Sequence, residues 1–502
     1  MWSATQVQLS DIVQTTFETM SWAEIYPWRE PQAGGPVIRQ VYDQVRGAIH
    51  DGALRPGGRL PSSRDLAQRL GVARASVVAA YDQLLAEGYA EGRQGSGTYV
   101  CRDLSGVLDL KPAARPPAAP QALPEVERPA AAEVMPPLSV EGPTFTSGRT
   151  LMDARALDAW SKSTRRALRT LGPVHFGYSD PAGDPRLRAA VAGYLRAARG
   201  VVCEPDQVIV TSGAQQAVDL AVRLLLRPGD AAWLEDPGYP PTWHALTAAG
   251  ARTAPIPVDR SGMIVQAGVA AAPDAKAVFV TPSHQYPLGV PLSMGRRLEL
   301  IAWARAAGAW IVEDDYAAEF RYAGAPLASL QGLEGGERVI YVGTLNKALF
   351  PGLRLGYLVA PRPLAGPLGE LRQLADRQPP TLTQAIVLDF MEGGQFAAHI
   401  RRRRLAYKAQ RDALAAALTR RLGHLLEVDV PDQGMHLIAH PRDGRSDLEM
   451  EAHARAGGVV ARAISRLYHA AQPRSGLMLG FTGFPVAAMD PGVARLARAL
   501  EG

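Results

Sequence analysis

The 502-residue sequence contains only two cysteines, Cys101 and Cys203. They lie far apart and have no metal-ligand spacing around them, which argues against a disulfide scaffold and against a zinc site. No stretch approaches the roughly 18 apolar residues that a membrane-spanning helix needs. The first residues also lack the basic-then-apolar pattern of a secretion signal, so we expect a soluble, cytoplasmic protein.

Lysine is scarce as well. Five of the 54 basic residues are lysines, and arginine supplies the remaining positive charge. A lysine inside a chemical motif is therefore notable. The formal net charge of +5 is compatible with an anionic partner, but charge alone does not identify one. Hydrophobic residues make up 47% of the chain, so it can bury a large core, and its length predicts roughly two to four domains.

Composition and pattern divide the chain into four parts. Residues 1–36 have no clear period and form an expected N-terminal arm. Residues 37–103 combine helical patterns with two short strands. Residues 104–142 are rich in alanine and proline, which predicts a semi-rigid, extended linker. In residues 143–502 strand-like apolar runs alternate with helices, and long helical patterns follow, which predicts a mainly parallel α/β sheet and then a smaller α+β subdomain.

The 37–103 unit carries the pattern of a helix-turn-helix. Helices are predicted over residues 37–49, 62–70 and 74–87, and two strands within residues 89–100. Gly71 separates the second and third helices in the manner of a C-cap glycine. The nine arginines of this unit are nearly balanced by seven acidic residues. A helical protein-binding module therefore remains an alternative to DNA binding.

Side chains near the starts of the second and third helices, and on the strand hairpin, suit nucleic acid. A recognition helix presents its first residues to base edges, where an arginine can pair with guanine. A glycine-rich hairpin tip can approach the DNA backbone closely. The candidate DNA contacts are Arg64, Arg74, Ser76, Arg93, Gly95 and Gly97.

A second set of motifs meets the requirements of pyridoxal 5′-phosphate (PLP). This cofactor needs a lysine for its aldehyde, an acid for its ring nitrogen, an aromatic ring against its face and donors for its phosphate. Lys347 follows the predicted strand at 339–342 and is the candidate Schiff-base lysine. Thr344 and Arg354 are candidate phosphate ligands. A solvated surface lysine is the alternative interpretation, and the scarcity of lysine disfavours it.

Three carboxylates and a phenol end the predicted strand at 310–313. Asp314 is placed to keep the pyridine nitrogen protonated, and Tyr316 to bond the phenolate oxygen of the ring. A metal site is the competing interpretation, but no histidine lies nearby in the sequence.

The turn at 211–216 joins a strand to a helix. It predicts a phosphate cradle that the backbone amides of Gly213, Ala214 and Gln215 would form. Tyr239 follows another strand-like run and is the candidate aromatic that stacks on the cofactor ring. A tyrosine of the protein core is the alternative.

The N-terminal motifs together resemble the winged helix of GntR-type bacterial regulators. The resemblance rests on five segments in the family's order: Leu60-Pro-Ser-Ser-Arg-Asp-Leu-Ala67, Gly71-Val-Ala-Arg-Ala-Ser-Val77, Ala80-Tyr-Asp-Gln-Leu84, Glu87-Gly-Tyr89 and Gly95-Ser-Gly-Thr-Tyr-Val100. It implies that the candidate DNA contacts face an operator. Ala73 and Ala75 occupy positions that are often polar in relatives.

The C-terminal motifs resemble fold-type I PLP enzymes of the aspartate aminotransferase group. The segments that carry this resemblance are Gly177-Tyr-Ser-Asp-Pro-Ala-Gly183, Glu235-Asp-Pro-Gly-Tyr239, Thr281-Pro-Ser-His-Gln-Tyr-Pro-Leu-Gly289, Glu313-Asp-Asp-Tyr316 and Gly343-Thr-Leu-Asn-Lys-Ala348. Together with the GntR-like domain and the linker, they resemble the MocR subfamily of regulators. The resemblance implies a multidomain protein: an α+β winged helix, then an α/β PLP domain of the aminotransferase fold with a smaller α+β subdomain. It also implies a head-to-tail, domain-swapped homodimer in which Tyr178 reaches the phosphate held by the partner subunit.

Two positions depart from the aminotransferase pattern. Tyr286 stands where the enzymes usually carry an asparagine. The MocR relatives lack that asparagine too. Met478 stands where a substrate-binding arginine is expected, and a thioether cannot pair with a carboxylate. Arg474 lies close by in the sequence, in an expected loop.

Two functions remain open. The first is a transcription regulator that binds operator DNA and senses, through its PLP domain, a small amino compound or PLP itself. The second is a working aminotransferase with an accessory DNA-binding module, in which Lys347 would be catalytic. Met478 argues against the second function. It also favours PLP itself, or a ligand without an α-carboxylate, as the effector.

Overall fold

The computed structural model divides into two compact units, residues 1–127 and 128–502. It describes residues 26–32, 35–93, 95–102, 104, 145–150, 152–324 and 327–501. Most of the predicted arm at 1–36 and nearly all of the predicted linker at 104–142 lie outside the described residues.

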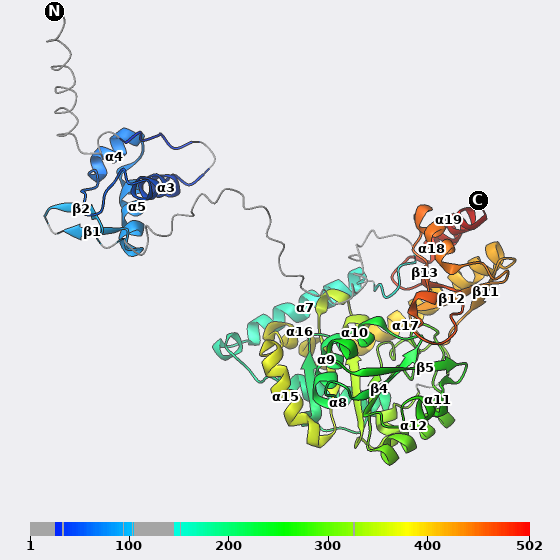
Figure 1. The fold of residues 1–502 in the computed structure, drawn as a ribbon. Helices are drawn as coiled ribbons and strands as arrows, with labels where there is room; N and C mark the ends of the chain where they lie inside the picture. Colours follow the sequence, from blue (N-terminus) through cyan, green and yellow to red (C-terminus); the bar gives the residue numbers. More distant parts are fainter. Residues whose placement is uncertain are drawn as a thin grey trace, which may run out of the picture. The chain divides into compact units, whose positions relative to one another are not determined.

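The first unit packs three helices with a β-hairpin (Figure 1). Its elements are α3 (Val37–His50), α4 (Ser63–Leu70), α5 (Arg74–Ala86), β1 (Ala90–Arg93) and β2 (Gly97–Val100). Ser62 caps α4 by accepting a 3.1 Å hydrogen bond from the Asp65 amide, and Gly71 ends it in the left-handed conformation at φ 63°. The helix-turn-helix and the hairpin predicted from the sequence are confirmed.

The core of this unit lies between its helices. Leu66, Leu70 and Val77 are completely buried, and α5 packs against both α3 and α4. Each such side chain stabilises the fold by about 1.5–3 kcal/mol through its burial. The Leu60 amide donates a 2.9 Å hydrogen bond to the Thr98 carbonyl, which joins the segment before α4 to β2. This contact holds the hairpin against the helices.

A central eight-stranded sheet organises the second unit, in the order β3-β10-β9-β8-β7-β4-β5-β6. The strands are β3 (Val208–Thr211), β4 (Ala231–Asp236), β5 (Arg252–Asp259), β6 (Gly262–Met263), β7 (Ala277–Val280), β8 (Trp310–Asp314), β9 (Val339–Thr344) and β10 (Gly356–Val359). The neighbours β9, β8, β7, β4 and β5 run parallel, and β10 is antiparallel to both β3 and β9. The mainly parallel sheet predicted from the alternating pattern is confirmed.

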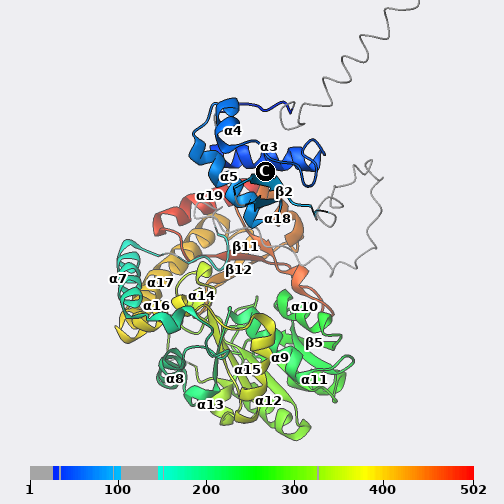
Figure 2. The ribbon, with the colours of Figure 1, turned by 90° about the vertical axis from the view of Figure 1, so that its left-hand side faces the viewer.

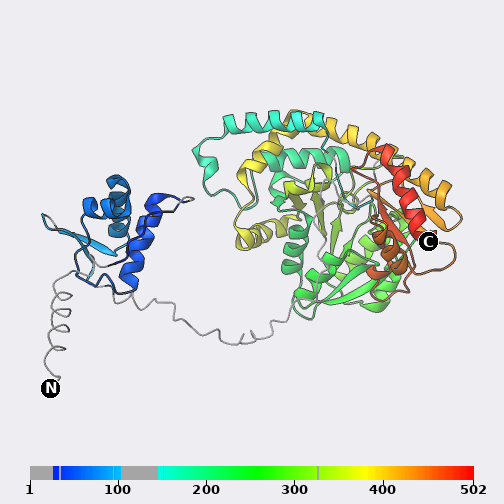
Figure 3. The ribbon, with the colours of Figure 1, turned by 90° about the horizontal axis from the view of Figure 1, so that it is seen from above.

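Helices cover both faces of this sheet. Successive side chains of a strand point to opposite faces, and β8 accordingly places Ile311 in one apolar cluster and Val312 in another. The helices are α7 (Ala154–Thr170), α8 (Pro185–Arg199), α9 (Ala214–Leu225), α10 (Pro240–Ala248), α11 (Val265–Ala271), α12 (Met294–Ala307), α13 (Leu330–Glu334), α14 (Leu345–Ala348), α15 (Arg362–Asp376), α16 (Thr381–Glu392) and α17 (Gln395–Leu422). Of these, α7 lies along α16 (Figure 3).

A smaller subdomain follows, grouped in orange and red at one end of the unit (Figure 2). Its antiparallel sheet has the order β11-β12-β14-β13, and three helices pack on it, including the second half of α17. The elements are β11 (Leu426–Asp429), β12 (His436–Pro441), α18 (Asp447–Ala456), β13 (Arg462–Ala463), β14 (Leu477–Gly480) and α19 (Met489–Glu501). The predicted α+β subdomain is confirmed. None of the helices among the described residues combines the length and the apolar character of a bilayer-spanning segment.

One carboxylate ties the two subdomains together. Asp236, at the end of β4, accepts hydrogen bonds of 2.6–2.8 Å from the consecutive backbone amides of His469, Ala470 and Ala471. We call this contact the Asp236 clamp. It anchors the segment after β13 to the edge of the large sheet.

We expect Leu66→Ala to lower the unfolding free energy of the first unit by about 2–5 kcal/mol. The substitution removes methyl groups from a completely buried position and leaves a cavity behind. Calorimetry of the full chain measures the effect. Leu85→Ala is the matched control in the same unit, because that side chain is 37% exposed, and we expect it to change stability by less than about 0.5 kcal/mol. Equal effects of the two substitutions would contradict the described core.

Candidate functional site

The carboxyl ends of five strands meet at one edge of the large sheet. These strands are β3, β4, β7, β8 and β9, which all run in the same direction. Open α/β sheets bind ligands at this edge. A cavity of about 230 Å³ opens there, lined by Ser147, Ala214, Gln215, Tyr239, Thr281, Tyr286, Asp314, Tyr316, Thr344, Asn346, Lys347, Pro351, Arg354, Met435, His436 and Arg462.

The structure brings most of the predicted cofactor residues into this cavity. Those that line it are Lys347, Asp314, Tyr316, Tyr239, Ala214, Gln215, Thr344 and Arg354. Gly213 directly precedes Ala214 at the start of α9. A larger cavity of about 670 Å³ shares His436 with this one, but it contains none of the predicted cofactor residues. The smaller cavity is therefore the candidate functional site.

Apart from Gly213, Tyr178 is the predicted cofactor residue that does not line the cavity of its own chain. Its side chain is 77% exposed, and the Arg377 guanidinium lies 3.6 Å from its ring centroid. Its contact with a partner subunit stays a prediction.

Three successive carboxylates at the end of β8 have different surroundings. Glu313 accepts hydrogen bonds of 3.0 Å from the backbone amides of Leu330 and Gln331. Asp315 accepts two hydrogen bonds from the Arg199 guanidinium, at 2.9 and 2.5 Å. Asp314, between them, lines the cavity, and no described residue donates a hydrogen bond to its Oδ1.

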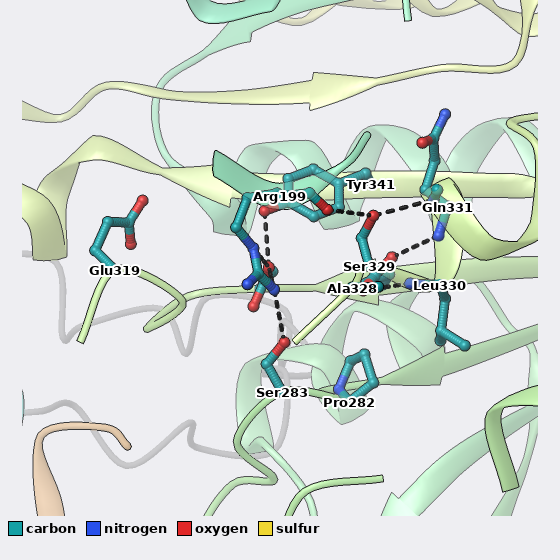
Figure 4. Close-up of polar contacts among 12 residues, drawn as sticks. Arg199, Pro282, Ser283, Glu319, Ala328, Ser329, Leu330, Gln331 and Tyr341 are labelled. Carbon is teal, nitrogen blue, oxygen red and sulfur yellow. Dashed lines mark hydrogen bonds and ion pairs between the residues drawn. The ribbon is translucent and has the colours of Figure 1, made fainter. Parts of the chain in front are cut away.

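The Arg199–Asp315 ion pair is almost completely buried. Arg199 comes from the end of α8 and lies between Tyr341 and Ser283 (Figure 4). Its guanidinium also donates to the Ser283 hydroxyl at 2.9 Å, and the Tyr341 hydroxyl donates to Asp315 at 2.8 Å. Asp315 is thus held on the side of β8 away from the cavity. The next carboxylate back, Asp314, is the one presented to a ligand.

The environment of Asp314 favours a positively charged hydrogen-bond donor as its partner. Burial, and then the neighbouring charge of Asp315, raise the pKa of Asp314 to about 7, and Lys347 opposes that shift. The Tyr316 hydroxyl also lacks a hydrogen-bond partner among the described residues. A protonated pyridine nitrogen would satisfy Asp314, and the phenolate oxygen of the same ring would satisfy Tyr316. These two buried polar atoms therefore fit the cofactor predicted from the sequence.

Lys347 lies in the cavity wall with its amino group held close to the backbone. Its Nζ donates a 3.5 Å hydrogen bond to the Gly148 carbonyl. Gly148 has φ +75°, and a Cβ there would lie 2.6 Å from that Nζ, so only glycine fits. Burial lowers the pKa of Lys347, and Asp314 opposes the shift. A lowered pKa favours the neutral amine, which is the nucleophilic form.

The start of α9 forms another part of the cavity wall, and the groups around it suit an anion. Gly213 begins α9 with φ 107°, and a Cβ there would lie 2.9 Å from Asn346 Nδ2 and 3.9 Å from Arg354 Nη1. The bare glycine leaves this space between a helix N-terminus, an amide and a guanidinium. Such donors suit a phosphate. The Asn346 side chain is positioned by its Oδ1, which accepts a 2.9 Å hydrogen bond from the Leu355 amide.

Aromatic rings form another wall of the cavity. The Tyr239 and Tyr286 rings meet edge to face with centroids 5.3 Å apart, and the His436 ring lies 5.9 Å from that of Tyr286. Burial lowers the pKa of His436 to about 4, so its ring is neutral near pH 7. Because a carbonyl oxygen only accepts, His436 Nε2 carries the proton and donates a 2.8 Å hydrogen bond to the Pro287 carbonyl.

The sequence analysis missed Ser147, His436 and Arg462 of the cavity wall, and it missed Gly148, which contacts Lys347. Each comes from a segment distant in sequence from the motifs, so no local pattern marks it. Asn346 could have been found, because it belongs to the same motif as Lys347.

The predicted DNA contacts of the helices are open to solvent in the first unit. Arg64 on α4 and Arg74 at the start of α5 are exposed, and Ser76 is partly buried. Arg74 Nε donates a 3.1 Å hydrogen bond to the Ser63 hydroxyl, which joins the two helices of the motif.

The predicted DNA contacts on the β-hairpin differ in their surroundings. Arg93 forms a 2.6 Å ion pair with Glu91, so part of its charge is already neutralised. Gly95 and Gly97 are exposed at its tip, with φ 73° and 111°. A Cβ on Gly97 would lie 3.2 Å from Nε of the exposed Arg59. Arg59 is a further candidate DNA contact that the sequence analysis missed.

Comparison with known proteins matches both units. Residues 144–466 match the family model "Aminotransferase class I and II", and residues 37–100 match "Bacterial regulatory proteins, gntR family". The chain is similar to the probable rhizopine catabolism regulatory protein MocR of Rhizobium meliloti, with 38% identity over 92% of this chain and 94% of the relative. It is also similar to the HTH-type pyridoxine biosynthesis transcriptional regulator PdxR of Corynebacterium glutamicum, with 36% identity over 77% of this chain and 80% of the relative.

A solved structure agrees with the second unit. LysN, the α-aminoadipate aminotransferase of Thermus thermophilus, was solved in complex with N-(5′-phosphopyridoxyl)-L-leucine. It superposes with a TM-score of 0.66 at 27% identity, covering 73% of this chain and 95% of LysN.

We expect Asp314→Asn to raise the melting temperature of the cofactor-free protein at pH 8, and to raise it less at pH 5. The folded-state pKa of Asp314, about 7, lies above its ordinary value. The protonated carboxyl therefore contributes its full stability to the folded state below about pH 4. This contribution falls as the pH rises from about 4 through the folded-state pKa of about 7. Asparagine avoids this loss, which is on the order of 1–3 kcal/mol at pH 8.

Calorimetry between pH 5 and pH 8 measures this difference. Asp219→Asn, at an exposed position of α9, is the matched control and should show no such trend. A gain for Asp314→Asn that does not change with pH would contradict the described environment of this carboxylate.

Proposed function

Because this chain belongs to the MocR-type subfamily of GntR transcription regulators, we propose that it regulates transcription in response to a small molecule. Its winged helix would bind operator DNA. Its aminotransferase-like domain would hold PLP and sense a small amino compound or PLP itself. The observation that carries the proposal is the pair of unsatisfied buried polar atoms, on Asp314 and Tyr316, beside Lys347 in one cavity.

Each part of the cavity would hold one part of the cofactor. Lys347 would bond the aldehyde carbon, and Asp314 would keep a proton on the pyridine nitrogen. Tyr316 would donate to the phenolate oxygen, while Tyr239 would cover the ring. The amides from Gly213 to Gln215, with Thr344 and Arg354, would hold the phosphate. PLP supplies an electrophilic carbon that condenses with primary amines, which is the chemistry that a sensor of amino compounds needs.

Names of similar proteins support both kinds of effector. PdxR is described as a regulator of pyridoxine biosynthesis, and LysN was solved with a phosphopyridoxyl-leucine adduct. One relative is thus named for vitamin B6 synthesis, and one solved structure similar to the second unit holds an amino acid joined to the cofactor. Either effector would act through different affinities for two states of the regulator.

The proposal includes a homodimer in the cytoplasm, where operator DNA lies. Phe176 and Tyr178 are 75% and 77% exposed, which is unusual for large aromatic side chains. Contact with a second copy would bury them, and would bring Tyr178 to the phosphate site of that copy.

A working aminotransferase is less well supported. At the position expected to hold a substrate-binding arginine, Met478 is 1% exposed and packs with Ile438 and Ile464 in an apolar cluster. That side chain does not line the cavity.

We expect the purified protein, supplied with PLP, to show a visible absorbance band that Lys347→Ala abolishes. The band is that of the imine between the cofactor aldehyde and the lysine amine, measured after removal of unbound PLP, which absorbs on its own. Lys408→Ala is the control, because that lysine is exposed on α17 and pairs with Asp412. A colourless wild-type protein, or a band unchanged by Lys347→Ala, would rule out the cofactor role of this lysine.

We expect Arg74→Ala to weaken operator binding by about 1–3 kcal/mol in a gel-shift titration at fixed salt. The reason is that Arg74 lies exposed at the start of the recognition helix α5. Arg39→Ala, at an exposed α3 position paired with Asp43, removes the same charge elsewhere and should have little effect. Equal losses in the two variants would mean that α5 carries no specific contact.

A further inference from the structure

The outer face of α5 in the first unit is mostly apolar. The helix buries one stripe of side chains in the core of this unit. Its exposed residues are Arg74, Ala75, Val78, Asp82, Leu85 and Ala86. A surface helix ordinarily carries polar residues opposite its buried stripe, because they face water. An outer face with four apolar side chains out of six therefore suits contact with another molecule.

Val78 places an apolar side chain one turn beyond Arg74. Its side chain is 38% exposed, although valine is a poorer helix former than alanine and gains little from contact with water. Residues three and four positions apart share a helix face, so Val78 lies beside both Arg74 and Ala75. These three residues form one surface on the N-terminal half of α5, which we call the α5 contact face.

Acidic side chains limit this surface toward the end of the helix. Asp82 is exposed one turn beyond Val78, and Glu87 is exposed where the helix ends. Carboxylates repel the phosphates of DNA, so we expect the C-terminal half of α5 to lie away from a bound duplex. The N-terminal half carries Arg74 and the positive end of the helix dipole. The α5 contact face is thus the part of the helix suited to the major groove.

Arg74 restricts which base Val78 can meet. The Ser63 hydroxyl accepts a 3.1 Å hydrogen bond from Arg74 Nε, and the Nη groups of an arginine can pair with O6 and N7 of guanine. A helix rises by about 1.5 Å per residue, so Arg74 and Val78 lie about 6 Å apart along its axis. That distance corresponds to about two base-pair steps of DNA. Val78 therefore meets a base close to the guanine that Arg74 contacts.

Thymine is the base whose major-groove edge carries a methyl group. The other edges present hydrogen-bond donors and acceptors to an approaching side chain. Apolar side chains such as alanine contact the thymine methyl, and covering it removes apolar surface from water. Against a cytosine amino group or an adenine amino group, the same apolar side chain would leave a donor without its partner.

We propose that Val78, with Ala75 beside it, contacts the 5-methyl group of a thymine in the operator, about two base pairs from the guanine that Arg74 contacts. This inference rests on the proposed function, because it requires the winged helix to bind operator DNA. It adds a base that is selected by an apolar contact rather than by a hydrogen bond. Ala75, at a position that is often polar in relatives, then belongs to the same apolar surface.

The test begins by finding a binding site. The full-length protein, supplied with PLP, selects duplexes from a random DNA library, and the enriched sequence is determined. Each thymine of that sequence is then replaced singly by 2′-deoxyuridine, which lacks the 5-methyl group and keeps every hydrogen-bonding group. Gel-shift titration at fixed salt measures the affinity for each duplex. At one thymine or more, we expect the loss of the methyl to weaken binding by the wild-type protein about three- to fivefold.

Val78→Ala should weaken binding to the thymine site and reduce the effect of deoxyuridine at that position to less than about twofold. Alanine is the better helix former, so we expect α5 to stay folded, and melting temperatures verify this. Val78→Thr keeps a branched side chain with one methyl and should keep part of the effect. Leu85→Ala is the matched control, because Leu85 is exposed on the same helix beyond Asp82, and it should keep the whole effect.

The outcomes separate this inference from the proposed function. A deoxyuridine effect that survives Val78→Ala in full arises from DNA shape and overturns the role of Val78. Wild-type affinity that no deoxyuridine changes also overturns it, leaves DNA binding standing, and assigns the apolar face to contact with a protein. A library that yields no enriched sequence overturns the operator-binding part of the proposed function itself.

Discussion

The buried ion pair between Arg199 and Asp315 is the interaction on which the candidate site depends. It holds the end of β8 in one orientation, with Asp315 turned into the protein and Asp314 toward the cavity. Removing one partner of such a pair costs about 3–5 kcal/mol, since it leaves an uncompensated charge inside the protein. Arg199 comes from α8 and Tyr341 from β9, so three separate elements meet at this carboxylate. Asp315 thus positions the cavity residue Asp314, although Asp315 itself does not line the cavity.

Much of the fold was predictable because its signals are local. Apolar runs predicted β3, β7, β8 and β9, and chemically distinctive residues follow the ends of these strands. Since the carboxyl ends of parallel strands share one edge, the sequence was sufficient to group residues as distant as Tyr239 and Lys347 in one site. In the first unit, Ser62 and Gly71 marked the two ends of α4.

The remainder of the site depends on relations that sequence patterns do not contain. Gly148 contacts Lys347 across 199 positions of chain, and nothing near Gly148 indicates that partner. The pairing of Arg462 with Met478 is a matter of strand register between β13 and β14, and β13 is only two residues long. A two-residue strand shows no alternation of apolar and polar residues, so β13 could not be recognised from the sequence.

The Asp236 clamp has a mechanical consequence for any signal that passes through this domain. Three backbone amides of the small subdomain donate hydrogen bonds to the Asp236 carboxylate, three residues before Tyr239. These bonds restrict translation of this end of the small subdomain relative to the large sheet. A rearrangement either breaks these bonds or keeps them and rotates the small subdomain about them. The second route leaves Tyr239 and the neighbouring edge of the pocket nearly stationary, while displacement grows with distance from the pivot and is greatest at the far rim of the subdomain.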